Sequence, residues 1–274
     1  MLKVTLASNS FNLQQRIITW AIEPASETYS LYKMDLYRGE TFAQTMPSYE
    51  LVVSGLDFTN LYSYTDISIS GMHLHSSRGF WYKAYIYNTY TGEAAWTREI
   101  TNEPVADYAT RTIWREKNLG LRERYGGRRF VVLKRKTYGD SCPVCWDTYT
   151  QRRLIDFCET CYDTGISGGF YQPISVLCTM NAALKRHQML LWGSWETGDA
   201  VIYTFHHPHI EPKDIFVDLY NRRWEVVQVR KVEKGLAIIE QDAQVRRIPK
   251  DDVVYNVEVS GYFTTSSIYT GEKV

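Results

Sequence analysis

Four cysteines in the middle of the chain are the residues whose types and spacing most clearly specify chemistry. Cys142 and Cys145 form one Cys-x-x-Cys pair, Cys158 and Cys161 form a second, and twelve residues separate the pairs. Each pair can present two thiolates to one side, and a hairpin between the pairs can close a tetrahedron around Zn²⁺ at about 2.3 Å per Zn–S bond. The spacing therefore predicts a zinc site, with two redox-active or disulfide-bonded pairs as the alternative.

The predicted zinc site is structural, because four thiolates fill a tetrahedral shell and leave no open position for a reacting water. It would hold a loop, residues 140–170, whose segment 146–157 is too polar to build a core of its own. Metal binding contributes about 10–16 kcal/mol in small zinc modules, comparable to the ~5–15 kcal/mol stability of a whole domain. Cys178 lies in an apolar, strand-like run and is expected to be a buried free thiol outside the site.

Other residues that could do chemistry form no recognisable catalytic set. His206, His207 and His209 have no carboxylate or cysteine at ligand spacing, so we expect a solvated turn, and we expect His73 and His75 on the surface. The sequence contains no nucleophile elbow and no glycine-rich phosphate loop motif. It therefore predicts a non-enzymatic protein.

Positive charge concentrates in one central stretch, although the chain as a whole is neutral. Lys plus Arg and Asp plus Glu each number 31, which excludes a uniformly basic nucleic-acid binder. Residues 111–136 carry 10 basic and 2 acidic side chains. The basic residues that we single out are Arg122, Arg124, Arg128, Arg129, Lys134, Arg135 and Lys136. They would contact either the phosphate backbone of DNA or acidic patches of neighbouring subunits, and the acidic flanking segments favour the second interpretation.

These candidate sites belong to a mainly β chain. Aromatic residues make up 14% of the sequence and include 21 tyrosines, a composition that favours strands. Short strands with turn signals about every 8–12 residues predict a β-sandwich over residues 1–104. A basic connector helix is predicted over 105–127. The short strands over 128–257 predict a small β-barrel, with a sandwich as the alternative, and the zinc loop is inserted in it. The polar residues 258–274 are expected to form a C-terminal tail.

Membrane insertion is not expected from the sequence. No apolar run approaches the roughly 18–20 residues that cross a bilayer, and the first residues lack the apolar core of a secretory signal. A reducing compartment follows from the cysteine usage, because the clustered cysteines suit metal binding better than a disulfide framework.

Two features of the N-terminal piece match a known module. Trp20 matches the core tryptophan of an early strand, and residues 82–88 followed by residues 91–93 match a late strand and its turn. On these residues the piece resembles a fibronectin type III domain. The resemblance covers about 90 residues and implies a β-sandwich that serves as a spacer or a binding surface.

The C-terminal piece carries a cysteine block and a terminal block. They comprise residues 133–147 and 158–173, then 214–218, 223–229, Gln241, 247–249 and 252–255. In the terminal block, the Arg223-Trp224 pair on a strand is followed by Ile248 and then by Asp252-x-x-Tyr255. On these residues the piece resembles the small β-barrels of tailed-bacteriophage head-completion and head-to-tail joining proteins. The resemblance implies a virion component assembled in the host cytoplasm.

Two hypotheses of different classes follow. The first is a structural phage protein that forms a homo-oligomeric ring at the neck or head-to-tail junction, contacts other virion proteins and uses zinc to shape an intersubunit loop. A position in the tail or baseplate is a variant of this hypothesis. The second is a zinc-ribbon nucleic-acid-binding protein. Interfaces enrich Tyr, Trp and Arg, and this chain is rich in tyrosine and carries charges of both signs, which favours the first hypothesis.

Overall fold

The protein is mainly β and divides into two compact units. The computed structural model describes residues 2–12, 15–23, 28–39, 49–66, 81–98, 100, 108–122, 125–147, 149–150, 152–182, 200–234 and 237–263. One unit, here called the sandwich unit, comprises the described residues of Met1–Ala106 and Lys136–Pro143. The other, the barrel unit, comprises those of Asp107–Arg135 and Val144–Thr270. The prediction of a mainly β chain is confirmed.

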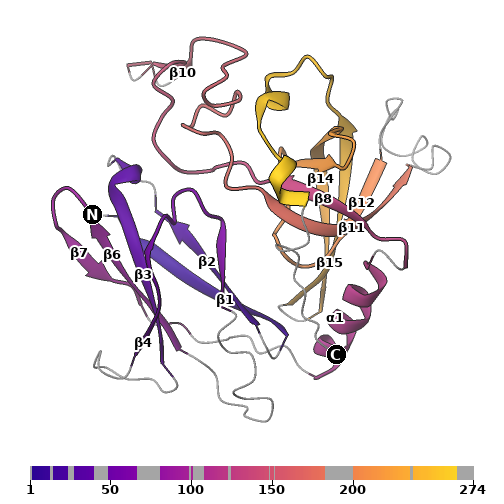
Figure 1. Cartoon of the computed structure of the whole chain (residues 1–274), viewed down its shortest axis with the longest axis horizontal. Coiled ribbons are helices and arrows are strands. Elements are labelled where there is room, and N and C mark those ends of the chain that lie inside the picture. The colour runs from indigo at the N-terminus through magenta and orange to yellow at the C-terminus, as the bar shows by residue number, and fades with distance from the viewer. Residues whose placement is uncertain are drawn as a thin grey trace. The chain divides into compact units, whose positions relative to one another are not determined.

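Seven antiparallel strands build two sheets in the sandwich unit (Figure 1). The three-stranded sheet has the order β1-β2-β5 and contains β1 (Val4–Asn12), β2 (Gln15–Ile22) and β5 (Ser63–Asp66). The four-stranded sheet has the order β4-β3-β6-β7 and contains β3 (Tyr32–Gly39), β4 (Glu50–Leu56), β6 (Trp81–Asn88) and β7 (Ala94–Trp96), with a 3₁₀ turn, η1 (Tyr29–Leu31), before β3. The sequence does not predict β1, and it does predict strands close to each of the others.

Buried side chains from both sheets form one hydrophobic core in the sandwich unit. Buried and half-buried residues alternate along β3 and β6, so every second side chain enters the core. Trp20 lies in this core, and its indole Nε1 donates to the carbonyl oxygen of Phe58 at 2.9 Å. Burial of a tryptophan is favourable when its N–H finds an acceptor, as it does here.

A charged group also lies in the core of the sandwich unit. Asp66 is fully buried and accepts from Arg38 Nη1 at 2.9 Å and from the Tyr82 hydroxyl at 3.0 Å. Burial and the Asp66 charge both raise the pKa of Tyr82. The other guanidinium nitrogen of Arg38 reaches Glu50, whose side chain is 74% exposed, at 2.9 Å. The core therefore depends on a matched ion pair as well as on apolar packing.

Residues 136–143 belong to the sandwich unit, whereas the sequence predicts them as part of the C-terminal piece. Lys136 Nζ donates to Asn60 Oδ1 at 2.6 Å, and Asp140 Oδ1 accepts from the backbone N–H of Tyr29 at 2.7 Å. The ring of Tyr138 packs 6.3 Å from that of Tyr29. Specific side-chain contacts at long sequence separation decide this placement, and no local pattern encodes them.

The barrel unit contains the predicted closed barrel. Its strands pair in the order β11-β12-β15-β14-β13-β8. Their bounds are β8 (Arg128–Leu133), β11 (Ile174–Ala182), β12 (Ala200–Thr204), β13 (Ile215–Asp218), β14 (Arg223–Lys234) and β15 (Ala237–Arg247). The sequence predicts two strands where β15 is one continuous strand. A short hairpin of β9 (Trp146–Asp147) and β10 (Arg152–Arg153) lies between the two cysteine pairs.

Strand β8 is buried on both of its faces. Phe130 and Val132 belong to one core cluster of the barrel, while Val131 and Leu133 belong to a second. The second cluster includes Val254 and Val259 from the chain that carries η4 (Val253–Asn256) and η5 (Ser260–Phe263). The expected tail from 258 therefore begins with residues that pack on the barrel, because they cover apolar side chains of β8. Residues 264–274 lie outside the described residues.

The helix α1 (Tyr108–Gly120) ends before the predicted end at residue 127 and packs on β15. The predicted start, residues 105–107, lies outside the described residues. Trp114 Nε1 donates to the carbonyl oxygen of Ile238 at 2.9 Å, and Lys117 Nζ lies 2.6 Å from a Glu240 oxygen. After the helix the chain turns back so closely that a Cβ on Gly127 would clash with the Leu121 carbonyl. Across the described residues, no helix is both long and apolar enough to cross a membrane.

The buried ion pair of the sandwich unit gives a direct test of its core. Asp66→Ala leaves the Arg38 charge buried without its main partner, and such a loss costs about 3–5 kcal/mol. Glu50→Ala removes a mostly exposed partner of the same guanidinium and should cost less than about 1 kcal/mol. Chemical denaturation, with hydrogen exchange of the β2, β3 and β6 peptides to localise the effect, measures both variants. Equal costs for the two variants would contradict the buried pair.

Candidate metal centre

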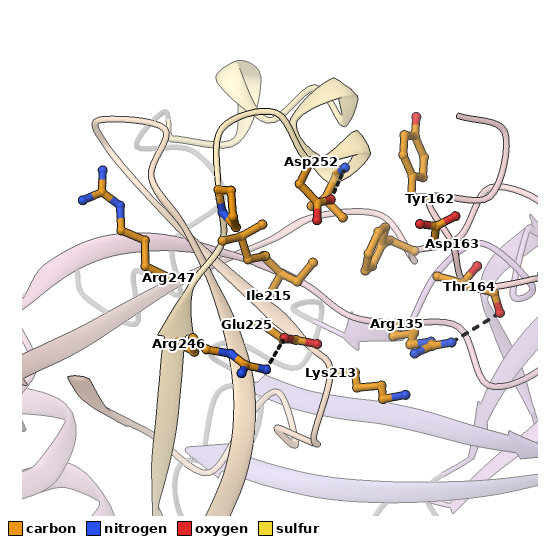
Figure 2. A pocket seen from close by; sticks show the side chains of 14 residues that line it. Arg135, Tyr162, Asp163, Thr164, Lys213, Ile215, Glu225, Arg246, Arg247 and Asp252 are labelled. Atoms are coloured by element: carbon orange, nitrogen blue, oxygen red, sulfur yellow. Dashed lines mark hydrogen bonds and ion pairs between the residues drawn. The ribbon is translucent and has the colours of Figure 1, made fainter. Parts of the chain in front are cut away.

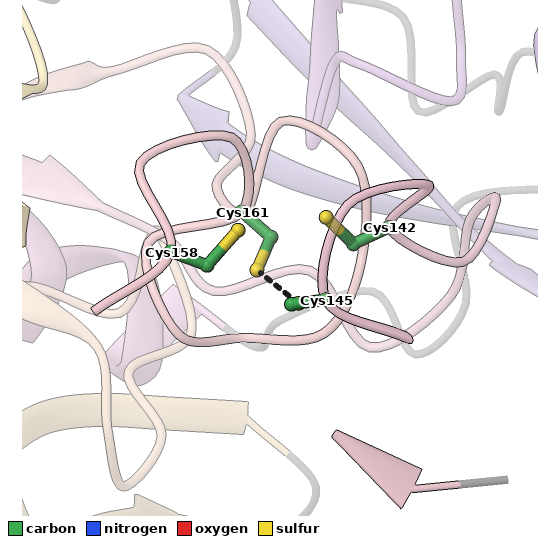
Figure 3. Close-up of side chains that lie close together, drawn as sticks. All are labelled: Cys142, Cys145, Cys158 and Cys161. Carbon is green, nitrogen blue, oxygen red and sulfur yellow. Dashed lines mark hydrogen bonds between the residues drawn. The ribbon is translucent and has the colours of Figure 1, made fainter. Parts of the chain in front are cut away.

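The four cysteines that the sequence singles out come together in the structure (Figure 3). The Sγ atoms of Cys142, Cys145, Cys158 and Cys161 all lie within 4.8 Å of one another. Each of these residues is at most 4% exposed, and none of the four is in a disulfide bond. Cys145 Sγ and Cys161 Sγ lie 3.3 Å apart. The spacing argument for one four-cysteine site is confirmed.

The tetrad fits a metal ion in geometry and in donor chemistry. Sulfur atoms at the corners of a tetrahedron with 2.3 Å bonds are about 3.8 Å apart, within the separation observed. Four sulfur donors in tetrahedral array suit zinc or iron rather than the hard cations that prefer oxygen. Burying four thiolates without a cation would be very costly, because like charges would face one another in a site with little water.

Backbone hydrogen bonds fix the cysteine positions. The Cys145 carbonyl oxygen accepts from Leu154 N at 2.8 Å, which ties the first pair to the strand that leads to the second. The backbone N–H of Cys158 donates to Asp163 Oδ1 at 3.0 Å, and the Cys161 carbonyl accepts from the Thr164 hydroxyl at 2.7 Å. The backbone of Leu154 and the side chains of Asp163 and Thr164 therefore hold the cysteines in position.

One glycine after the last cysteine is required by its surroundings. Gly169 has φ +63°, and a Cβ there would lie 2.5 Å from the Cys161 carbonyl oxygen. Only glycine adopts this conformation at low cost while allowing such a close approach. The chain can therefore return past the last ligand and rejoin the barrel.

The cysteine loop leaves the barrel after β8 and returns to it at an adjacent point. Tyr171 N donates to the Lys134 carbonyl oxygen at 2.9 Å, and Arg135 pairs with Phe170 in an antiparallel bridge. The two ends of the intervening segment are thus held together by backbone pairing. Closing the ends reduces the conformational freedom of the loop before any metal binds.

Cys178 lies apart from the tetrad, as expected. It is fully buried in the barrel core opposite Thr204. Burial raises the pKa of this thiol to about 12. It is therefore protonated and apolar in character at neutral pH.

The seven basic residues do not form one exposed surface. Lys134 is 2% exposed, and its Nζ lies 2.8 Å from Asp214 Oδ2 and 3.0 Å from a Glu211 oxygen. Lys136 is also buried, and burial lowers the pKa of its ammonium. These two lysines serve internal contacts and are not available to a phosphate backbone.

The remaining basic residues are distributed. Arg135 donates to the Thr164 carbonyl oxygen at 3.3 Å, and Arg129 donates to that of Phe263 at 3.3 Å. Arg128 is exposed, Arg122 and Arg129 are half-buried, and Arg124 lies outside the described residues. The sequence alone cannot separate these roles, because each basic residue looks equivalent until its acidic or carbonyl partner is known.

The expectation of a solvated histidine turn is wrong. His206 and His207 are 3% and 5% exposed, and the His206 ring stacks on Trp114 with centroids 4.7 Å apart. Gln241 holds this segment, because its side-chain nitrogen donates to the carbonyl oxygens of Phe205 and Pro208 at 2.7 and 2.8 Å. His73 and His75 lie outside the described residues, and within the described chain the cysteine tetrad is the one group with metal-ligand geometry.

Burial makes these histidines neutral. It lowers the pKa of His206 well below its ordinary value and that of His207 to about 3, and neighbouring imidazoles act in the same direction. Burial also lowers the pKa of His209, with Lys231 and Lys134 contributing. Protonation at mildly acid pH is therefore opposed by the folded state.

The residues of the terminal block meet in space. The Arg223 guanidinium lies 5.0 Å from the centre of the Tyr255 ring and donates to the carbonyl oxygens of Val254 and Val257. The Tyr255 hydroxyl donates to the Ile248 carbonyl oxygen at 3.2 Å. The cluster fastens η4 to the end of the barrel, a structural role for residues that the sequence marks only as a pattern.

A cavity of about 500 Å³ lies beside the last cysteine, within the barrel unit (Figure 2). Its lining combines Tyr162, Asp163 and Thr164 with residues from the barrel strands and from the approach to η4. Charges of both signs face it, including a Glu225–Arg246 pair at 3.5 Å. The cavity therefore has both apolar and charged walls, and its charges are nearly balanced in sign.

The fold and the site define the class of this protein: a two-unit, mainly β chain with a closed barrel and a cluster of four buried cysteines that could hold a metal ion. Comparison with models of known protein families and with curated proteins gave no match.

The tetrad predicts one metal ion per chain. Cys158→Ser should abolish stoichiometric metal binding, because a tetrahedral site that loses a thiolate binds its ion far more weakly. Cys178→Ala removes a buried cysteine outside the tetrad and should leave the metal content unchanged. Elemental analysis of the purified proteins, with titration of free thiols, measures both. Full metal content in Cys158→Ser, or equal loss in the two variants, would argue against the site.

The buried histidines predict a loss of stability in mild acid. The folded-state pKa of His207 lies below the unfolded value, so the unfolded chain binds the extra proton, and stability falls as pH drops from about 6.5 towards 3. Between pH 7 and pH 5, His207 alone should reduce the free energy of unfolding by about 2 kcal/mol. Chemical denaturation at both pH values measures the loss, which His207→Gln should reduce. An unchanged pH dependence in that variant would refute this role.

Proposed function

We propose that this chain is a non-enzymatic structural component of a phage particle, assembled in a homo-oligomeric ring at the neck or head-to-tail junction, with zinc as its structural metal. The phage assignment depends on the sequence resemblance of the cysteine and terminal blocks. The observation that carries the structural role is the closed tetrad: four buried sulfur ligands leave no position for a substrate or a water on the metal.

Zinc is the metal that the donor set favours. Four cysteines in two Cys-x-x-Cys pairs on a short hairpin are typical of structural zinc modules. Such an ion stabilises a segment that lacks a core, and residues 144–157 carry mostly exposed side chains. The ion would therefore act by fixing the shape of the loop.

The strand order of the sandwich unit supports a fibronectin type III-like domain. Three strands form one sheet and four form the other, and β3 pairs with β6 in the middle of the four-stranded sheet. Sandwiches of this kind with about seven strands serve as spacers and binding modules in many unrelated proteins. We assign the unit such a supporting role in the particle.

A zinc-ribbon nucleic-acid-binding protein is the alternative function. It requires an exposed basic surface near the metal. The burial of Lys134 and Lys136 weakens this alternative, while the exposed Arg128 keeps it testable. A position in the tail or baseplate would use the same structural properties and would differ only in the neighbouring proteins.

The two functions predict opposite results for the purified full chain. As a ring component it should have a native mass several times that of one chain and should show no salt-sensitive retention on DNA. Native mass spectrometry and DNA-affinity chromatography at low and moderate salt measure these properties. Retention that is lost in the Arg128→Ala, Arg129→Ala double variant would favour the nucleic-acid alternative. A single-chain mass at every protein concentration would contradict the ring.

A further inference from the structure

The cysteine loop exposes an unusual number of large apolar side chains. They are Val144, Tyr149, Leu154, Ile155 and Phe157, here called the apolar loop surface, with exposed fractions of 58%, 94%, 70%, 50% and 73%. The other exposed large apolar residues of the described chain are spread over six separate strands and turns. A concentration of this kind marks an interaction site more often than it marks ordinary surface.

The apolar loop surface is built around the metal ligands. Val144 and Phe157 directly precede Cys145 and Cys158 in the chain, and Leu154 donates its N–H to the Cys145 carbonyl oxygen at 2.8 Å. The cysteines beside these residues are buried, while the apolar side chains are not. The loop therefore derives its shape from the tetrad and not from the burial of its own apolar groups.

Backbone conformation supports the same conclusion. Phe157 has φ +61°, a left-handed conformation that is uncommon for a bulky residue and costs energy. The strained residue is also 73% exposed, so no core packing of its side chain compensates for the strain. Presenting this ring at the surface of a fixed loop is a property of a contact site.

The charges of the loop indicate what kind of partner fits it. Between Val144 and Phe157 the described acidic residues are Asp147 and Asp156, and the basic ones are Arg152 and Arg153. Arg152 lies opposite Asp147 in the β9–β10 hairpin, and Arg153 lies 2.8 Å from Asp156. The loop therefore carries two charges of each sign and no net charge over these residues, and the chain as a whole is neutral. Such a balance allows identical chains to associate without repulsion.

We propose that the apolar loop surface is the self-association site of this protein and that its occupant is a second copy of the same chain. This inference rests on the proposed homo-oligomeric ring. It assigns one side of each contact between neighbouring copies to this loop, and the other side is a different surface of the next copy, as a ring requires. The metal ion is then indirectly required for association, because it holds the apolar side chains in place for the neighbouring copy. Burial of the apolar side chains supplies the affinity. The charges of Asp147, Arg152, Arg153 and Asp156 restrict how the two copies align.

The test is a loop variant that keeps all four cysteines. Leu154→Ser, Ile155→Ser and Phe157→Asn are combined, with Asn at 157 because it tolerates positive φ. The control combines Leu219→Ser and Tyr220→Ser, which remove exposed apolar side chains from the turn between β13 and β14. Analytical ultracentrifugation of the full chains over a range of concentrations gives the association constant, and elemental analysis of the same samples gives the metal content.

We expect the triple variant to associate at least about 100-fold more weakly than the wild type while it retains one metal ion per chain. The control should associate as the wild type does. If the triple variant loses its metal, the single variant Leu154→Asp repeats the measurement with the loop less perturbed. A metal-replete loop variant that associates like the wild type overturns the inference and leaves the proposed assembly intact. A metal-replete wild-type protein that stays a single chain overturns both.

Discussion

The convergence of four thiolates is the constraint on which the central part of this structure depends. Residues 144–157 carry too few buried apolar groups to form a core, and yet the cysteines beside them are among the most buried side chains of the chain. If the four cysteines are ionised, they need a cation to stay buried so close together. A metal ion bound there would replace a hydrophobic core and leave the apolar side chains of the loop available for other contacts.

The barrel prepares the site before any metal binds. Strand β8 leads into the cysteine loop, and the bridge between Arg135 and Phe170 returns the chain close to the point where it departed. Both faces of β8 are buried, by the barrel interior and by the C-terminal chain around Val254 and Val259. This double burial makes the start of the loop rigid. The rigid barrel and the braced loop are consistent with a protein whose function is to hold neighbours in place.

Patterns with a local physical cause were predictable from the sequence. Short strand-like runs bounded by turn signals predicted β2, β3 and β6, and the Cys-x-x-Cys spacing predicted the tetrad, because both depend on residues that are close in the chain. The predicted limits of β15 and α1 were less accurate. The length of each element depends on its contacts with distant residues, such as that of Trp114 with Ile238, and these contacts leave no local pattern. The first strand was missed altogether.

Residue types and spacing by themselves determined the mainly β class and the grouping of the four cysteines. They left a small barrel and a sandwich both open for the C-terminal piece, and pairing between strands far apart in the chain closed the barrel. Tertiary structure alone decided which polar groups are internal. The sequence predicted a basic surface that includes Lys134 and Lys136, but their ammonium groups donate to Asp214 and Asn60. It predicted a solvated turn at His206 and His207, but both are buried: His206 stacks on Trp114, and Gln241 hydrogen-bonds to the same segment. The physical reason is that burial of a polar group depends on a partner many residues away, and a local pattern carries no record of that partner.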